Sequence, residues 1–162
     1  MDQISIMGYI PGAIGRITEL HGTYYAQNWD FGLEFEAKVA TELAEFLSRY
    51  DPSRDGFWTV CVNDKVEGGI TIDSIRAASE GVHLRWFILS DRLRGNTYGN
   101  RLMEKAVGFC RAKGYKRIYL WTFQGLDAAR HLYEKFEFML TEQKEGTRWG
   151  RLVNEQLYAL EI

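Results

Sequence analysis

The segment Leu84–Gly99, LRWFILSDRLRGNTYG, constrains the fold of this chain more than any other. An apolar stretch typical of a buried strand runs directly into a turn with two glycines, and a helical pattern follows over Thr97–Lys113. The first amides of a helix have no partner within it, and the helix dipole adds positive charge there. The segment therefore predicts a strand–turn–helix unit with an anion-binding site at the helix N-terminus.

Arg92 and Arg101 flank this segment and add positive charge. Three known kinds of phosphate-binding turn are candidates for it. A P-loop ends in Gly-Lys followed by Ser or Thr, and a dinucleotide fingerprint needs Gly-x-Gly-x-x-Gly in an early βαβ unit. Neither pattern occurs at this turn. The third kind is an acyl-coenzyme A loop, Arg/Gln-x-x-Gly-x-Gly/Ala, which the turn approaches as Arg94-Gly95-Asn96-Thr97-Tyr98-Gly99.

The rest of the chain alternates between short strands and helices. The residue patterns predict strands over Ser5–Tyr9, Phe57–Val62, Gly68–Ile75, Val82–Leu89, Arg117–Thr122, Phe138–Lys144 and Leu152–Leu160. They predict helices from Pro11 to about Asn28, and over Leu33–Tyr50, Thr97–Lys113 and Asp127–Phe136. This order of elements predicts a single α+β (α/β) domain, residues 1–162, built on one mixed sheet.

Composition narrows the function classes. Hydrophobic residues make up 46% of the 162 residues and charged residues 26%, so a sizeable core is expected. The formal net charge of −2 argues against a general nucleic-acid binder. We find no signal peptide and no stretch long enough to span a membrane, which predicts a cytoplasmic protein. Cys61 and Cys110 lie in apolar segments, as expected for buried thiols in a reducing compartment.

Two motifs in register resemble the GNAT acetyltransferase superfamily. The loop Arg94–Gly99 is similar to its acyl-CoA loop, with Thr97 in place of the first glycine. After the next strand, Ala128–Phe138 resembles the closing signature Ala-x-x-x-Tyr-x-x-x-Gly-Phe, with Glu137 in place of glycine. The chain looks most similar to the acetyltransferase halves of MarR-type regulator fusions, which share LRW-like strands, LWT, LDAAR and a WG…EQ-x-x-x-L ending.

The resemblance implies a fold and a co-substrate. The fold would be a mixed, mostly antiparallel sheet of six to seven strands, flanked by about four helices and splayed between the fourth and fifth strands. The co-substrate would be acetyl-CoA, with no metal. The implied coenzyme-binding residues are Phe87, Leu89, Arg94, Gly95, Asn96, Thr97, Tyr98, Gly99 and Asn100. Leu126 stands where many family members carry an asparagine that contacts pantetheine, so that contact is lost or made differently.

Two residues are candidates for proton transfer. Tyr133 matches the tyrosine of the family, and a hydroxyl with a pKa of about 10 is protonated at pH 7 and can act as general acid toward the leaving thiolate. His83 lies eleven residues before Arg94, where some family members place a glutamate base. A histidine there is able to accept the proton of the amine, directly or through water. The alternatives are a tyrosine that only packs and a histidine that is only solvated.

Residues around these candidates allow two interpretations each. Arg85 shares a strand face with His83, and either binds an acidic group of the acceptor or forms a salt bridge, while Trp86 should face the other way. Trp121 and Trp149 either line the acceptor cleft or pack. An aromatic run in the first helical region allows the same two roles: Tyr24, Tyr25, Trp29 and Phe31.

The sequence thus predicts an acetyl-CoA-dependent N-acetyltransferase that transfers acetyl directly to an amine of a small molecule or peptide. An acyl-CoA sensor without turnover is the alternative, suggested by the departures at Thr97, Leu126 and Glu137. Tyr133 and the surviving loop favour the enzyme. A nucleic-acid-binding regulator is disfavoured by the negative charge and by the lack of a regulator half. The aromatic residues would suit a homodimer.

Overall fold

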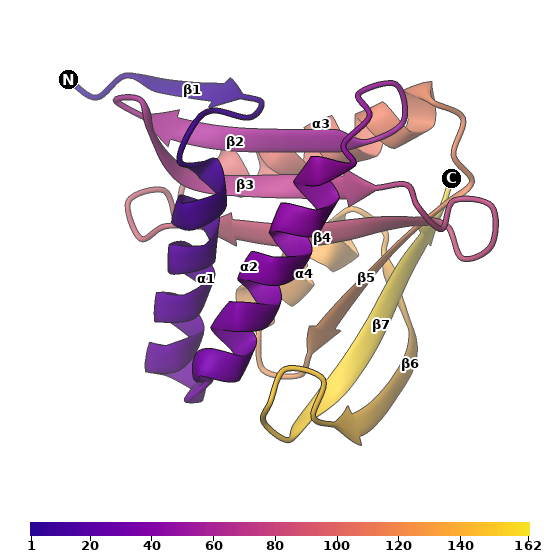
Figure 1. Ribbon diagram of the computed structural model, residues 1–162. Coiled ribbons are helices and arrows are strands. Elements are labelled where there is room, and N and C mark those ends of the chain that lie inside the picture. The colour runs from indigo at the N-terminus through magenta and orange to yellow at the C-terminus, as the bar shows by residue number, and fades with distance from the viewer.

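A seven-stranded sheet in the order β1-β2-β3-β4-β5-β7-β6 separates two layers of helices (Figure 1). The computed structural model describes all residues from Met1 to Ile162. The strands are β1 (Ile4–Met7), β2 (Gly56–Val62), β3 (Lys65–Asp73), β4 (Val82–Leu89), β5 (Arg117–Phe123), β6 (Met139–Gly146) and β7 (Val153–Glu161). The helices are α1 (Ala13–Trp29), α2 (Leu33–Ser48), α3 (Tyr98–Ala112) and α4 (Asp127–Lys135).

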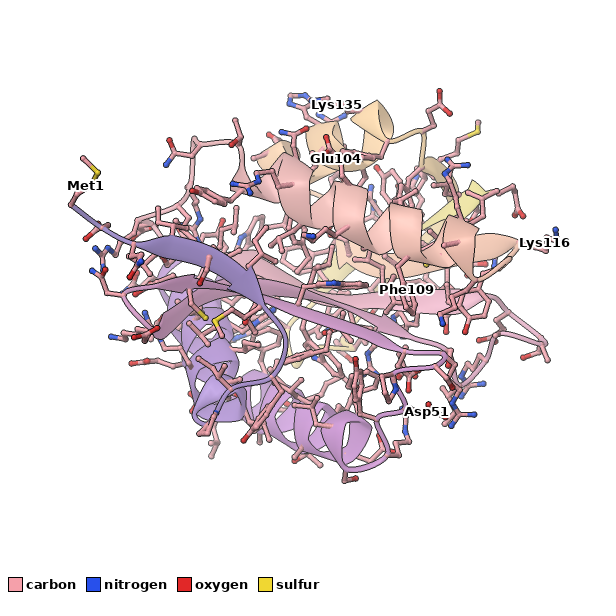
Figure 2. The ribbon with its side chains drawn as sticks, turned by 90° about the horizontal axis from the view of Figure 1, so that it is seen from above. Met1, Asp51, Glu104, Phe109, Lys116 and Lys135 are labelled. Atoms are coloured by element: carbon pink, nitrogen blue, oxygen red, sulfur yellow. The ribbon has the colours of Figure 1, made fainter.

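Helices α1 and α2 cover one face of the sheet, and α3 and α4 cover the other (Figure 2). Each helix turns an apolar stripe to the sheet because its apolar residues recur every three or four positions. On α2 these residues are Phe35, Val39, Leu43 and Phe46. On α3, Phe109 lies against Trp58 of β2, with 5.4 Å between the ring centroids. The largest buried cluster lies between the sheet and α3, and it includes the buried thiol Cys110.

Strands β4 and β5 separate soon after they meet. They form the only parallel pair, and only Val82 and His83 of β4 have partners in β5. Every other neighbouring pair in the sheet is antiparallel. This confirms the predicted mixed sheet with four helices and a splay between its fourth and fifth strands. None of the four helices is long and apolar enough to cross a membrane.

Several predicted boundaries shift by one to three residues. The first helix begins at Ala13 rather than near Pro11, because Gly12 has a φ of 95° and lies outside the helical region. Asn63 and Asp64 form the turn between β2 and β3, and their φ values of 51° and 66° fit a two-residue hairpin.

A β-bulge in β4 corrects the predicted orientation of Trp86. The pairing of β3 with β4 shifts register between Gly69 and Thr71, and Trp86 has a positive φ of 48°. A bulge breaks the alternation of side chains along a strand. Trp86 therefore lies on the same face as Arg85, whose guanidinium carbon is 4.1 Å from the Trp86 ring centroid, and it packs against Phe46 of α2.

Helix α4 ends in a Schellman motif centred on Glu137. The Phe138 N–H donates to the Tyr133 carbonyl and the Glu137 N–H to the Glu134 carbonyl, while Glu137 has a φ of 72°. The rings of Phe138 and Tyr133 complete the motif with centroids 6.1 Å apart. The backbone geometry that favours glycine is thus kept although the residue is glutamate, and the motif fixes the end of α4 that carries Tyr133.

We expect Glu137→Gly to stabilise the fold. A left-handed conformation costs a residue with a side chain about 1–2 kcal/mol. Glycine would remove this cost, but its greater freedom in the unfolded chain lowers the free energy of unfolding by about 0.4–1 kcal/mol. The net increase in the free energy of unfolding should be about 0.5–1 kcal/mol, measurable by urea titration. Glu137→Ala serves as the control, since it removes the charge but keeps the strain. A glycine variant no more stable than the alanine variant would contradict this explanation.

Candidate functional site

A cleft of about 540 Å³ occupies the space where β4 and β5 diverge. Two groups of residues define it. The loop wall consists of Arg94, Gly95, Asn96, Gly99 and Asn100. The aromatic wall consists of Tyr25, Phe35, Trp121, Phe123 and Trp149. Tyr133 of α4 and His83, Phe87 and Leu89 of β4 also line the cleft. Of the residues predicted to bind coenzyme, only Thr97 and Tyr98 are absent from its lining; they are the N-cap and the first residue of α3.

The loop wall presents backbone amides. Gly95 has a φ of 80°, which turns the chain into α3. The amides of Thr97 to Asn100 donate to no backbone carbonyl, and the first amide of the helix to do so is that of Arg101, 3.0 Å from the Thr97 oxygen. Such a cluster of free donors suits an anion. Thr97 has a φ of −84°, so a side chain at this position does not strain the backbone.

Gly99 brings three elements together at the loop wall. A Cβ atom there would lie 3.5 Å from Leu132 of α4, 3.6 Å from Leu89 and 3.7 Å from Phe87 of β4. A larger side chain would therefore push into the cleft or against β4. Arg94 lies over the Tyr24 ring at 4.3 Å and donates to Asp91, which fixes the loop to α1.

Tyr133 is held by packing on three sides. Its ring centroid lies 6.4 Å from that of Phe87, 6.1 Å from Phe138 and 6.0 Å from Tyr158. Burial raises the pKa of the Tyr133 hydroxyl well above its usual value. The hydroxyl therefore stays protonated at any physiological pH and remains a hydrogen-bond donor at the cleft.

His83 lies on β4 at the cleft, but its environment makes it a weak base. Its ring stacks on Tyr119 of β5, with centroids 4.6 Å apart and planes 16° apart. Burial, and next the positive charge of Arg85, lower the His83 pKa to about 3. The imidazole is thus neutral at pH 7, and its affinity for a proton is far below that of a solvated histidine.

Arg85 forms salt bridges, one of the two roles considered for it. It donates to Glu42 of α2, and its Nη1 lies 3.2 Å from the Oδ2 of Asp73 on β3. Arg49 contacts both carboxylate oxygens of the same aspartate, which is only 1% exposed. Burial alone would raise the pKa of Asp73, but the hydrogen bonds from Arg49 and the Ile75 amide and the charges of Arg49 and Arg85 leave it lowered. Arg85 is therefore occupied by carboxylates of the protein.

The aromatic wall is built on one face of β5. Alternate residues of a strand share a face, which places Tyr119, Trp121 and Phe123 in one row. Trp149, from the turn between β6 and β7, packs on Phe123 with ring centroids 5.5 Å apart. Of the aromatic run in the first helical region, Tyr24 and Tyr25 line the cleft, whereas Trp29 and Phe31 pack around Phe123.

The sequence model described as the acetyltransferase (GNAT) family matches residues 16–138, more than half of the chain. The chain belongs to the acetyltransferase (GNAT) family. No curated protein matches the sequence. By family the chain is an N-acetyltransferase, as the sequence predicts.

Solved structures share the GNAT fold over nearly the whole chain. An acetyltransferase from Streptococcus agalactiae is 24% identical, with a TM-score of 0.73 and 98% of both chains covered. The structure of yncA from Salmonella typhimurium with its cofactor acetyl-CoA is 16% identical, with a TM-score of 0.74, covering 98% of this chain and 93% of that one. Ard1 from Thermoplasma volcanium is 17% identical, with a TM-score of 0.76, covering 98% and 97%.

The three departures from the GNAT motifs differ in their structural effect. Thr97 and Glu137 adopt the backbone conformations that their positions need. Leu126 is the N-cap of α4. Its apolar side chain makes no capping hydrogen bond and offers no amide to a coenzyme. Sequence reasoning missed Glu42 and Arg148, which also line the cleft. No local pattern distinguishes these two from other surface charges of a helix and a turn.

Proposed function

We propose that this GNAT-family chain transfers the acetyl group of acetyl-CoA directly to an amine, with Tyr133 as general acid. One observation carries the proposal. The free amides of Gly99 and Asn100 at the start of α3 and the hydroxyl-bearing Tyr133 line the same cleft, where β4 has separated from β5. When bound, the coenzyme supplies an acetyl group activated as a thioester.

The residues of the cleft fit such a coenzyme. The amides of Thr97 to Asn100 would hold its phosphates, because they are unpaired and lie at the positive end of the α3 dipole. The backbone of Phe87 to Leu89 has no partner in β5 and would pair with the amide-bearing pantetheine arm. Gly99 leaves room between them because it has no side chain.

Tyr133 would act on the leaving sulfur. Transfer breaks the carbon–sulfur bond, and a thiolate with a parent pKa of about 8.5 needs a proton or a hydrogen bond. Burial keeps the Tyr133 hydroxyl protonated, so that a donor is present at every working pH. The surrounding rings of Phe87, Phe138 and Tyr158 fix its direction.

The acceptor must also lose a proton before it attacks. We predicted His83 as a candidate base, but a histidine with a pKa of about 3 takes a proton from an ammonium group only at a large energetic cost. We therefore propose that the acceptor is deprotonated by solvent. The cost depends on the amine: a lysine side chain is neutral at pH 7 at a cost of about 4.6 kcal/mol, against about 1 kcal/mol for the α-amine at a peptide N-terminus, with a pKa of about 7.8.

An acyl-CoA sensor without turnover finds support only at Leu126, because the other two departures preserve the backbone of the motifs. The closer similarity to acetyltransferase halves of MarR-type fusions, the cytoplasmic location and the homodimer stay predictions from the sequence.

Thermal unfolding with acetyl-CoA tests the donor site. Ligand at 100 times its dissociation constant should add about 2.7 kcal/mol of stability, or a rise in Tm of about 5–10 °C. Gly99→Val should abolish the rise, because its side chain would meet Leu132 and Leu89. Gly108→Val, on the same helix with no neighbour within 4 Å of its Cβ position, should keep it. If the native chain shows no rise at millimolar acetyl-CoA, the proposal is wrong.

A further inference from the structure

Arg148 is held at the aromatic wall by two hydrogen bonds to Glu155 and by stacking on tryptophan rings. Its Nε donates to the Oε1 of Glu155 at 3.2 Å, and its backbone N–H donates to the Oε2 of the same residue at 2.8 Å. Glu155 has a side chain only 4% exposed, so this anchor is buried. The guanidinium carbon lies 3.9 Å from the Trp121 ring centroid and 5.9 Å from that of Trp149.

The turn that carries Arg148 is itself tied down. Arg151 donates through Nη2 to the carboxylate of Asp30 at 2.8 Å and through Nε to the Asp30 carbonyl at 3.0 Å. This joins the β6–β7 turn to the connection between α1 and α2. Arg148 is thus preorganised by its own anchor and by the fixed turn around it.

Arg148 differs from the other cations in this part of the cleft, because the two terminal nitrogens of its guanidinium group have no partner. Arg85 is already paired with Glu42 and Asp73, and Lys38 is paired with Glu42. The terminal nitrogens of Arg148 donate to no protein acceptor, and the residue lines the cleft. Two parallel N–H donors held in a plane match a carboxylate, which they bind bidentately.

The surfaces beside Arg148 are apolar. Trp121 and Trp149 adjoin it, Phe123 packs on Trp149, and Phe35 and Tyr25 continue the wall toward α1. His83 is neutral and stacked on Tyr119, so it adds no second positive charge that would hold the anion elsewhere. The wall therefore accommodates a hydrocarbon or aromatic group next to the bound anion.

We propose that the amine acceptor carries a carboxylate that binds Arg148, and that it is an α-amino acid with an apolar side chain. This inference rests on the proposed function, since the same molecule presents its amine to the acetyl donor. The reaction forms an N-acetyl amino acid and releases the thiol of coenzyme A. The carbon–nitrogen bond forms as the carbon–sulfur bond breaks. The ammonium form loses one proton to solvent before attack, and the nitrogen loses a second proton after attack. Tyr133 donates one proton to the sulfur and is reprotonated, so the net reaction releases one proton.

The test compares amino acids with the amines that lack their carboxylate. Thiol release from acetyl-CoA is followed with L-phenylalanine, L-leucine, L-methionine and L-tryptophan, each beside its decarboxylated amine. We expect at least one amino acid to be favoured over its amine by about 10-fold to 100-fold in kcat/KM, the range of hydrogen bonds to a charged group. Equal or better use of every amine, or no use of any amino acid, would overturn the inference.

Variants of Arg148 localise the effect. Arg148→Met should raise KM for the amino acid about 10-fold to 100-fold and leave the decarboxylated amine unaffected. Arg148→Lys should rescue part of the loss, because it keeps the charge without the fork. Arg54→Met, at an exposed arginine paired only with Asp51, is the matched control.

Failure of this inference is distinguishable from failure of the proposed function. The acetyl-CoA rise in Tm should persist in Arg148→Met, because Arg148 lies at the aromatic wall and not at the loop wall. A normal rise combined with no preference for carboxylates overturns only the acceptor assignment. Absence of the rise in the native chain overturns the donor site as well. Equal loss for both acceptors in Arg148→Met would show that the arginine supports the cleft and does not bind the carboxylate.

Discussion

Tyr133→Phe should lower kcat by about 10²-fold to 10⁴-fold, the usual contribution of a positioned acid or base. The substitution removes one oxygen atom and keeps the ring that packs between Phe87, Phe138 and Tyr158. Acetyl-CoA binding should persist because the amides of the α3 N-terminus are untouched. The measurement is steady-state thiol release together with the Tm rise on adding acetyl-CoA.

The matched control for Tyr133 is Tyr158→Phe. Tyr158 lies in the same aromatic layer, with its ring centroid 6.0 Å from that of Tyr133, but it is not part of the cleft lining. We expect this variant to keep a near-native kcat. A Tyr133→Phe enzyme as fast as the native one would remove the tyrosine from the proton-transfer role. Loss of acetyl-CoA binding in the same variant would point to a packing role.

Short-range patterns predicted the parts of the fold and site that depend on neighbours in sequence. The strand–turn–helix unit follows from Leu84–Gly99 alone, since strand, glycines and helix are consecutive. The Schellman end of α4 lies where the family motif places its glycine, although the residue there is Glu137. The splay of β4 from β5 came from the resemblance to a family, not from the pattern of residues.

Features that depend on contacts between distant residues could not be predicted from the sequence. Alternation along β4 predicts opposite faces for Arg85 and Trp86, and only the pairing with β3 reveals the bulge that brings them together. His83 has an ordinary sequence context, and its weak basicity arises from burial after stacking on Tyr119, far along the chain. Arg148 acquires its place through Glu155 and Trp121, which the fold brings to it.

Buried His21 and half-buried His83 predict a steep loss of stability in mild acid. Burial lowers the pKa of His21 to about 4 and that of His83 to about 3, against 6.5 for an unperturbed histidine. The folded state disfavours the protonated form, so the unfolded state binds more protons below pH 6.5. Stability therefore falls as pH decreases from 6.5, by about 1.4 kcal/mol per pH unit for each histidine. The loss from His21 levels off near pH 4 and that from His83 near pH 3.

Urea unfolding between pH 7 and pH 4.5 measures this slope above the titration midpoints of unperturbed carboxylates. Two histidines over about two pH units remove about 5 kcal/mol, as much as the whole stability of a marginal domain. His21→Gln and His83→Gln should each remove about half of the slope, whereas His131→Gln, at an exposed position of α4, should leave it unchanged. A slope equal in all four proteins would mean that neither histidine is held neutral by burial. In that case His83 would again be a candidate for the base, because a histidine with a normal pKa accepts protons near pH 7.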